Sequence, residues 1–145
     1  MRKRRGGRHR GFFIVAGTIL LGCILLMVEI FANKPMVSGI ARSQHDLRTA
    51  GSYATRLQSE SGTFQSADAP GLTALDSGRT YVGADQSATR AGEISVYAGV
   101  TFWAAATPVN GACFYILERG GQPTLYGGGT DCTGRAALAA SQDAW

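Results

Sequence analysis

The chain has 145 residues, enough for one domain, and its net charge of +4 is unevenly distributed. Residues 1–10 carry six positive charges and no acid, whereas residues 35–145 hold seven Arg and nine Asp or Glu and are net −2. The basic balance therefore belongs to a short tail. It does not support strong nucleic-acid binding by the folded part, and a basic run beside an apolar stretch typically sets membrane orientation.

The first predicted element is a membrane-spanning helix over residues 12–33, preceded by a basic cytoplasmic leader, residues 1–11. The 21 residues 12–32 form an apolar stretch interrupted only by Thr18 and Glu29. At about 1.5 Å per residue, such a helix crosses a bilayer core of about 30 Å. Because only Lys34 immediately follows, the positive charges predict a single-pass protein with its N-terminus in the cytoplasm and residues 34–145 outside the cell.

Three other fates fit parts of this segment. Secretion with cleavage is the weakest, because Ile30 stands where a small residue is wanted before a cut after Ala32. Leu20-Leu21-Gly22-Cys23 looks like a lipobox, but the residues after Cys23 stay apolar, whereas a lipoprotein normally turns polar there. Cys23 fits equally as a small hydrophobe within the helix, and its lipidation stays open. The fourth fate is removal of a prepilin leader between Gly11 and Phe12.

The extracellular half of the same long helix is predicted over residues 34–61. Pro35 bends a helix without having to end it, and Ser61-Gly62 supplies a stop. A narrow apolar stripe repeats every seven residues: Ile40, Leu47 and Ala54. The charged residues mostly lie off this stripe: Arg42, Asp46, Arg48 and Arg56. The stripe needs a partner surface, and fewer than four heptads give little support to the alternative of a coiled-coil stalk.

Residues 62–145 are predicted to form a small antiparallel β-sheet, which makes the fold α+β. Leu72 and Leu75 suit one short helical turn, and residues 79–82 a short strand. Three longer apolar runs follow, at residues 93–97, 100–106 and 113–117. Asn110-Gly111 between the last two is a strong hairpin signal. We expect a meander that the N-terminal helix covers on one face.

The C-terminal part is predicted to be a loop over residues 127–134 and a short Ala-rich helix over residues 135–141. Cys113 and Cys132, 19 residues apart, are expected to form a disulfide in an oxidising compartment, worth about 3 kcal/mol for a loop of that size. A zinc site needs four ligands, and the exterior part offers these two cysteines and His45. The spacing also differs from the C-x-x-C pair of redox sites.

We expect no enzyme, cofactor or metal. His45 and Asp46 are adjacent on a helix and point about 100° apart, so they do not form a base with its orienting carboxylate. The run from Gly127 to Thr130 lacks the lysine and following helix of a phosphate loop. Four aromatic residues could form a sugar-stacking or adhesive surface, although such residues on strands more often pack in a core: Trp103, Tyr115, Tyr126 and Trp145.

Taken in order, these features resemble a type IV pilin or pseudopilin. Gly11-Phe12 matches the junction after a basic leader, residues 12–59 match the long helix in length, and Pro35 lies near where pilin helices often carry Pro. Residues 43–48 and the stretch from Trp103 to Trp145 resemble pilin-like proteins of high-GC bacteria. The resemblance implies a membrane-stored chain, cut by a leader peptidase, that assembles with other pilin subunits through its helix. The assembly positions are Phe12, Phe13, Ile14, Ala16, Glu29 and Pro35.

One position departs from the family pattern. Pilins usually have Glu at the fifth mature position, where it is thought to pair with a neighbour's N-terminal amine, and this chain has Ala16. Glu29 lies thirteen residues further, about 20 Å along a helix, and its carboxylate can reach the membrane interface. We therefore expect a minor or atypical subunit of a type IV pilus-like or secretion-type filament. The alternative is an anchored extracellular binding or adhesion domain that does not polymerise.

Overall fold

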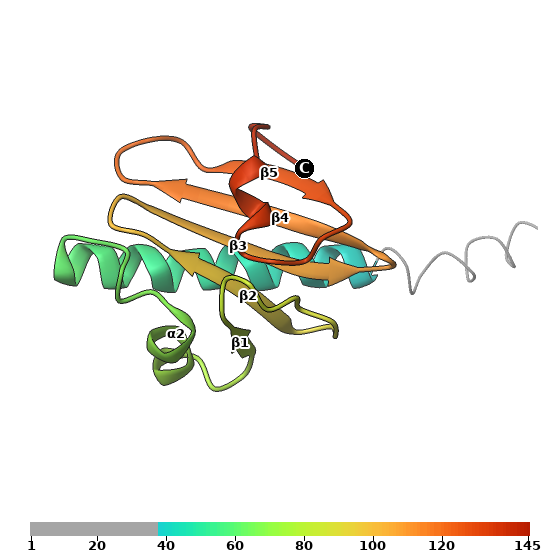
Figure 1. The fold of residues 1–145 in the computed structure, drawn as a ribbon, viewed down its shortest axis with the longest axis horizontal. Helices are drawn as coiled ribbons and strands as arrows, with labels where there is room; N and C mark the ends of the chain where they lie inside the picture. Colours follow the sequence, from blue (N-terminus) through green and yellow to red (C-terminus); the bar gives the residue numbers. More distant parts are fainter. Residues whose placement is uncertain (1–37) are drawn as a thin grey trace, which may run out of the picture. The chain divides into compact units, whose positions relative to one another are not determined.

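The long helix opens the described part of the chain, residues 38–145 of a computed structural model (Figure 1). It runs unbroken from residue 38 through residue 61. Gly62 ends it with φ of +79°, and its N–H donates to the Gln58 carbonyl at 2.8 Å. Glycine adopts this left-handed conformation without a steric penalty. The predicted stop at Ser61-Gly62 is therefore confirmed.

Several predictions fall on residues 1–37, outside the described residues. These are the leader, the cut between Gly11 and Phe12, the membrane helix over residues 12–33, and all six assembly positions: Phe12, Phe13, Ile14, Ala16, Glu29 and Pro35. Within residues 38–145, no helix is both long and apolar enough to span a bilayer.

The helix packs its apolar stripe on one face of a sheet, as predicted. Leu47, Ala50 and Ala54 are fully buried, and they share a core with Trp103 and Ile116 from the sheet. Full burial of a side chain of the size of Leu47 or Ile116 contributes about 1.5–3 kcal/mol. This core is what fixes the helix to the domain.

Two short elements follow the helix. Helix α2 (Ala69–Leu75) begins at Asp68, whose carboxylate accepts from the Gly71 N–H at 2.9 Å, and it buries Leu72. This confirms the predicted helical turn. Strand β1 (Thr80–Val82) confirms the strand expected at residues 79–82.

The sheet has five strands in sequential order, β1-β2-β3-β4-β5. Strands β2 (Glu93–Ala98), β3 (Phe102–Val109) and β4 (Ala112–Arg119) confirm the three predicted strands. Asn110 and Gly111 turn the β3–β4 hairpin with φ of 49° and 81°, the left-handed pair that favours this dipeptide. The prediction of a wholly antiparallel sheet is wrong at one edge, because β1 pairs parallel to β2. Residues 83–92 carry the chain back between them.

The tail departs further from its prediction. The loop expected over residues 127–134 is confirmed for residues 130–134, which lie outside helices and strands. It is wrong for residues 127–129, which belong to strand β5 (Leu125–Gly129), paired antiparallel with β4. Its glycines reduce strand propensity, yet they leave room for neighbours, since a Cβ on Gly129 would collide with the Tyr115 ring. The helix expected at residues 135–141 is a shorter 3₁₀ helix, η1 (Ala136–Ala139).

The second face of the sheet is covered by residues 130–140, which we call the C-terminal segment. Ala104, Tyr115 and Leu117 point to that face. They pack with Ala137 in η1 and with Ala140 just after it. The fold is thus α+β, with the long helix on one face and the C-terminal segment on the other (Figure 1).

Candidate functional site

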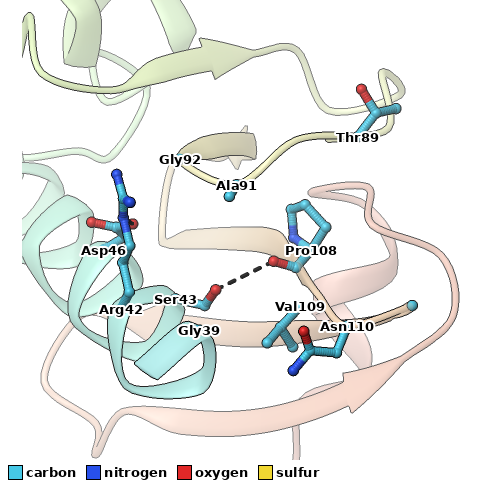
Figure 2. Close-up of a pocket in the computed structure, with 11 residues that line it drawn as sticks. Gly39, Arg42, Ser43, Asp46, Thr89, Ala91, Gly92, Pro108, Val109 and Asn110 are labelled. Carbon is cyan, nitrogen blue, oxygen red and sulfur yellow. Dashed lines mark hydrogen bonds and ion pairs between the residues drawn. The ribbon is translucent and has the colours of Figure 1, made fainter. Parts of the chain in front are cut away.

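A pocket of about 240 Å³ lies where three segments meet at the start of the described helix. The helix contributes Gly39, Arg42, Ser43 and Asp46, the loop before β2 contributes Thr89, Ala91 and Gly92, and the β3–β4 hairpin contributes Pro108 to Gly111. Figure 2 shows the helix side chains and the hairpin facing each other across this space. No single segment forms the pocket, so its shape depends on tertiary packing.

One direct contact joins the helix to the hairpin. The Ser43 hydroxyl donates to the Pro108 carbonyl at 3.3 Å (Figure 2), and only 6% of Ser43 is exposed. The neighbouring Asn110 amide lies near Gly39, where a Cβ would be 3.8 Å from its oxygen. A Cβ at position 39 would therefore make only ordinary van der Waals contact with the hairpin.

Charged residues form the deeper wall. Asp46 is only 7% exposed, although it lies beside the apolar stripe and not on it. Its carboxylate is held by the Arg79 guanidinium at 2.8 Å, while Arg42, whose side chain is 71% exposed, lies at 3.9 Å. Arg79 arrives from just before β1, and this long-range ion pair offsets the burial of Asp46.

Arg79 serves a second carboxylate, that of Asp76 at 2.7 Å. Burial by itself raises the pKa of Asp76, but hydrogen bonds from Arg79, Tyr81 and the Gly78 N–H outweigh it and hold that pKa below its ordinary value. The Tyr81 hydroxyl donates to Asp76 at 2.9 Å, and burial followed by this bond raises the pKa of Tyr81. These two shifts favour a charged Asp76 carboxylate and a protonated Tyr81 hydroxyl beside Arg79.

The predicted site residues separate in the structure. His45 is exposed while Asp46 is buried, so the two side chains diverge, as their helical spacing indicates. Within the described residues, no group of three or more His, Cys, Asp or Glu is placed to hold a metal ion. The polar side chains that line the pocket are those of Arg42, Ser43, Asp46, Thr89 and Asn110.

The predicted disulfide is confirmed. Cys113 on β4 and Cys132 are bonded, with Cα atoms 5.2 Å apart, and both are buried. The bond ties the segment that follows β5 to a strand inside the sheet.

The four aromatic residues do not form one open surface. Trp103 and Tyr115 are core residues, with 0% and 5% exposed. Tyr126 and Trp145 are half-buried, and their rings lie in contact at a tilt of 54° with centroids 4.3 Å apart. The Arg48 guanidinium lies 5.2 Å from the Trp145 ring centre. The preference for core packing over sugar stacking is therefore confirmed for Trp103 and Tyr115.

Sequence patterns pointed to the disulfide and the aromatic core but not to the pocket. The one hint of the pocket in the sequence was Asp46, which directly precedes Leu47 of the apolar stripe. Its burial could not be predicted from that position, because it depends on the ion pair with the distant Arg79. Comparison with known proteins adds no further assignment: no protein-family model, curated protein or solved structure matches the chain.

Proposed function

We propose that the chain is a structural subunit, a minor or atypical pilin-like protein of a cell-surface filament of type IV pilus-like or secretion type. The observation that carries this proposal is that residues 38–61 have their own sheet to pack on, whereas a second apolar stretch precedes them in the sequence. Residues 38–61 already bury their apolar stripe on their own sheet. The apolar stretch 12–32 lies only a few residues before them in the sequence. It is therefore the surface left for lipid or for neighbouring subunits.

The outward side of the described helix is polar, which also points to residues 12–32 as the assembly surface. His45, Ser52, Thr55 and Ser59 are exposed and polar, so this side does not require a partner to cover it. Helices in lipid associate through close packing because lipid tails are as apolar as their side chains. Assembly through residues 12–32 would thus exchange lipid contacts for helix contacts and leave the folded domain unchanged.

The alternative is an anchored extracellular domain that binds a ligand and does not polymerise. The pocket beside Ser43 and Asp46 is the observation that favours it. This alternative predicts a monomer in detergent and a saturable ligand, whereas a filament subunit is expected to be recovered in multimers.

Mass spectrometry of the native N-terminus tests the first step of the proposal. A chain that begins at Phe12, with or without a methyl group on its amine, is expected for a processed subunit. An intact Met1 would leave the anchored domain. A freely soluble chain that begins downstream of Ala32 would contradict both, and a diacylglyceryl group on Cys23 would identify a lipoprotein instead.

Cross-linking in cells tests the second step. In a Cys23→Ala background, we would place one cysteine at Ile14 within the apolar stretch and, in a separate control, one at Ser52 on the exposed side of the helix. A filament predicts a cross-linked dimer that depends on Ile14→Cys, because the single free thiol of each chain can join it to only one neighbour. Recovery of monomers alone, in cells that produce the surface structure, would refute the proposal.

A further inference from the structure

The loop of residues 83–92 is held in place by the C-terminal segment. The Ala88 N–H donates to the Cys132 carbonyl at 2.9 Å, and the Arg135 N–H donates to the Ala84 carbonyl at 3.1 Å. The Arg135 guanidinium also pairs with the Asp85 carboxylate. These contacts lie three residues apart on the C-terminal segment and four apart on the loop, so two short stretches are joined along their length.

A buried serine completes this junction. Ser95 on β2 is fully buried; its hydroxyl donates to the Gly83 carbonyl at 2.9 Å and accepts from the Gly134 N–H at 2.7 Å. Gly134 approaches so closely that a Cβ there would lie 2.6 Å from the Val96 carbonyl carbon. The position of Gly134 is therefore tightly constrained by the sheet beneath it.

The covalent tether sits at the start of the same stretch. Cys132 is bonded to Cys113, and residues 130–133 belong to no helix or strand. Next to the disulfide, the Asp131 carbonyl accepts a hydrogen bond from the Tyr115 hydroxyl on β4 at 2.8 Å. Without the disulfide, residues 130–133 would be restrained by noncovalent contacts alone, and a crosslink adds to that restraint because it limits the opened states of the segment.

The far end of the loop reaches the pocket. The Glu93 carboxylate accepts from the Thr89 and Arg90 N–H groups at 2.6 and 3.2 Å, which closes a turn directly after Ala88. Thr89, Ala91 and Gly92 then form one wall of the pocket. The disulfide thus connects to this wall through Cys132 and Ala88.

We propose that the Cys113–Cys132 disulfide is a redox-controlled latch for this pocket wall. Oxidation fixes residues 132–135, these hold residues 83–88, and the loop then presents Thr89, Ala91 and Gly92 to the helix and the β3–β4 hairpin. With both thiols reduced, the loop is released while the helix remains packed on the sheet. The latch is independent of whether the chain forms a filament.

The chemistry is a thiol–disulfide exchange. In the forward direction, a disulfide oxidant accepts two electrons and two protons from Cys113 and Cys132 and leaves as two thiols, while the Sγ–Sγ bond forms. In reverse, dithiothreitol donates the two electrons and two protons and becomes its cyclic disulfide. The latch therefore closes in an oxidising compartment and opens under reduction.

Arg90 provides the test, because it is an exposed trypsin site inside the loop. The full-length chain with Cys23→Ala, in detergent, is digested briefly with trypsin before and after dithiothreitol, and a mass increase of two units confirms reduction. Cys132→Ser reproduces the reduced form without reductant. Arg90→Gln removes the fragment that ends at residue 90 and so identifies it. Cleavage at Arg56 in the long helix reports whether the whole domain has opened.

A latch predicts that cleavage after Arg90 becomes at least about tenfold faster on reduction and in Cys132→Ser, because proteolysis follows the population of the opened loop. Cleavage at Arg56 should change little. Arg135→Ala, which removes the ion pair with Asp85 and keeps the disulfide, is expected to give a smaller increase. An unchanged rate at Arg90, or an equal rise at Arg56, would overturn the proposal.

Discussion

Arg79 and Asp46, 33 residues apart in the sequence, are joined by a short ion pair between the start of β1 and the long helix. Only 15% of the Arg79 side chain and 9% of the Asp46 side chain are exposed. Because Arg79 also holds Asp76, one guanidinium pairs with carboxylates on two different segments. The helix is thereby fixed to the β1 edge of the sheet by charge as well as by its apolar stripe.

Loss of that guanidinium should be strongly destabilising. Arg79→Met leaves two buried carboxylates without their cation, and breaking a buried pair in this way costs about 3–5 kcal/mol. The matched control is Arg42→Met, since the Arg42 side chain is 71% exposed and such changes usually stay within about 0.5 kcal/mol. Chemical denaturation of both variants measures the difference. Equal midpoints would show that the cluster does not stabilise the fold.

Glu118 should make the domain less stable as the pH rises to neutrality. It lies on β4 facing the helix, and burial raises its pKa above the ordinary value of 4.5, although a hydrogen bond from Thr124 lowers it in part. A raised carboxyl pKa means that the stabilising contribution is complete below the ordinary pKa and is lost as the pH rises through the folded value. Glu118→Gln should therefore raise the denaturation midpoint at neutral pH.

The control for this pH effect is Asp76→Asn, which has the opposite sign. The pKa of Asp76 is lowered in the fold, so its contribution is present at neutral pH and is lost as the pH falls below its ordinary value of 3.8. Asp76→Asn should lower the midpoint at neutral pH. The gain from Glu118→Gln should disappear near about pH 4, where the wild-type carboxyl is itself protonated. A gain that persists there would rule out titration of Glu118 as its cause.

Two glycines should respond oppositely to the same substitution. Gly51 lies inside the long helix, and a Cβ there would make ordinary contacts with Glu118 and Ile116 at 3.4 and 3.5 Å. Gly51→Ala should therefore stabilise the domain by about 0.5–1 kcal/mol through the backbone entropy of glycine. Gly134→Ala should destabilise it, because its Cβ would meet the Val96 backbone. Thermal unfolding compares the two, and stabilisation by Gly134→Ala would contradict the close approach.

The two tryptophans should be distinguishable by fluorescence quenching. Trp103 is fully buried and its indole N–H donates to the Ala67 carbonyl at 3.0 Å, whereas Trp145 is only half-buried. A Trp145→Phe chain, which retains Trp103, should emit at short wavelength and resist acrylamide. The wild-type chain should show an additional quenched component. Ready quenching of the Trp145→Phe chain would contradict the placement of Trp103 in the core.

Local chemistry explains which elements could be predicted. Asn110-Gly111 specifies its own turn, and Gly62 ends the helix through its own φ angle. Residues 93–97 alternate with the period of a strand, and the runs at residues 100–106 and 113–117 are apolar, rich in aromatic residues and of strand length. The disulfide followed from two cysteines and an expected compartment. None of these inferences required knowledge of a distant segment.

Other features depend on partners that are remote in the sequence. Strand β5 forms despite three consecutive glycines because β4 pairs with it and Tyr115 fills the space that side chains would occupy. Strand β1 is parallel because residues 83–92 return along the C-terminal segment. Hydrophobic periodicity predicts neither the pairing of β5 with β4 nor the parallel direction of β1.

Patterns within the sequence were sufficient to predict the helix on a sheet, the hairpin and the disulfide, since propensity, turn geometry and apolar spacing act within a few residues. The burial of Asp46, the parallel edge and the pocket depend on contacts between remote segments. Each of these arises where segments tens of residues apart exchange charges or hydrogen bonds, and the free energy of such a contact depends on the neighbours that exclude water from it.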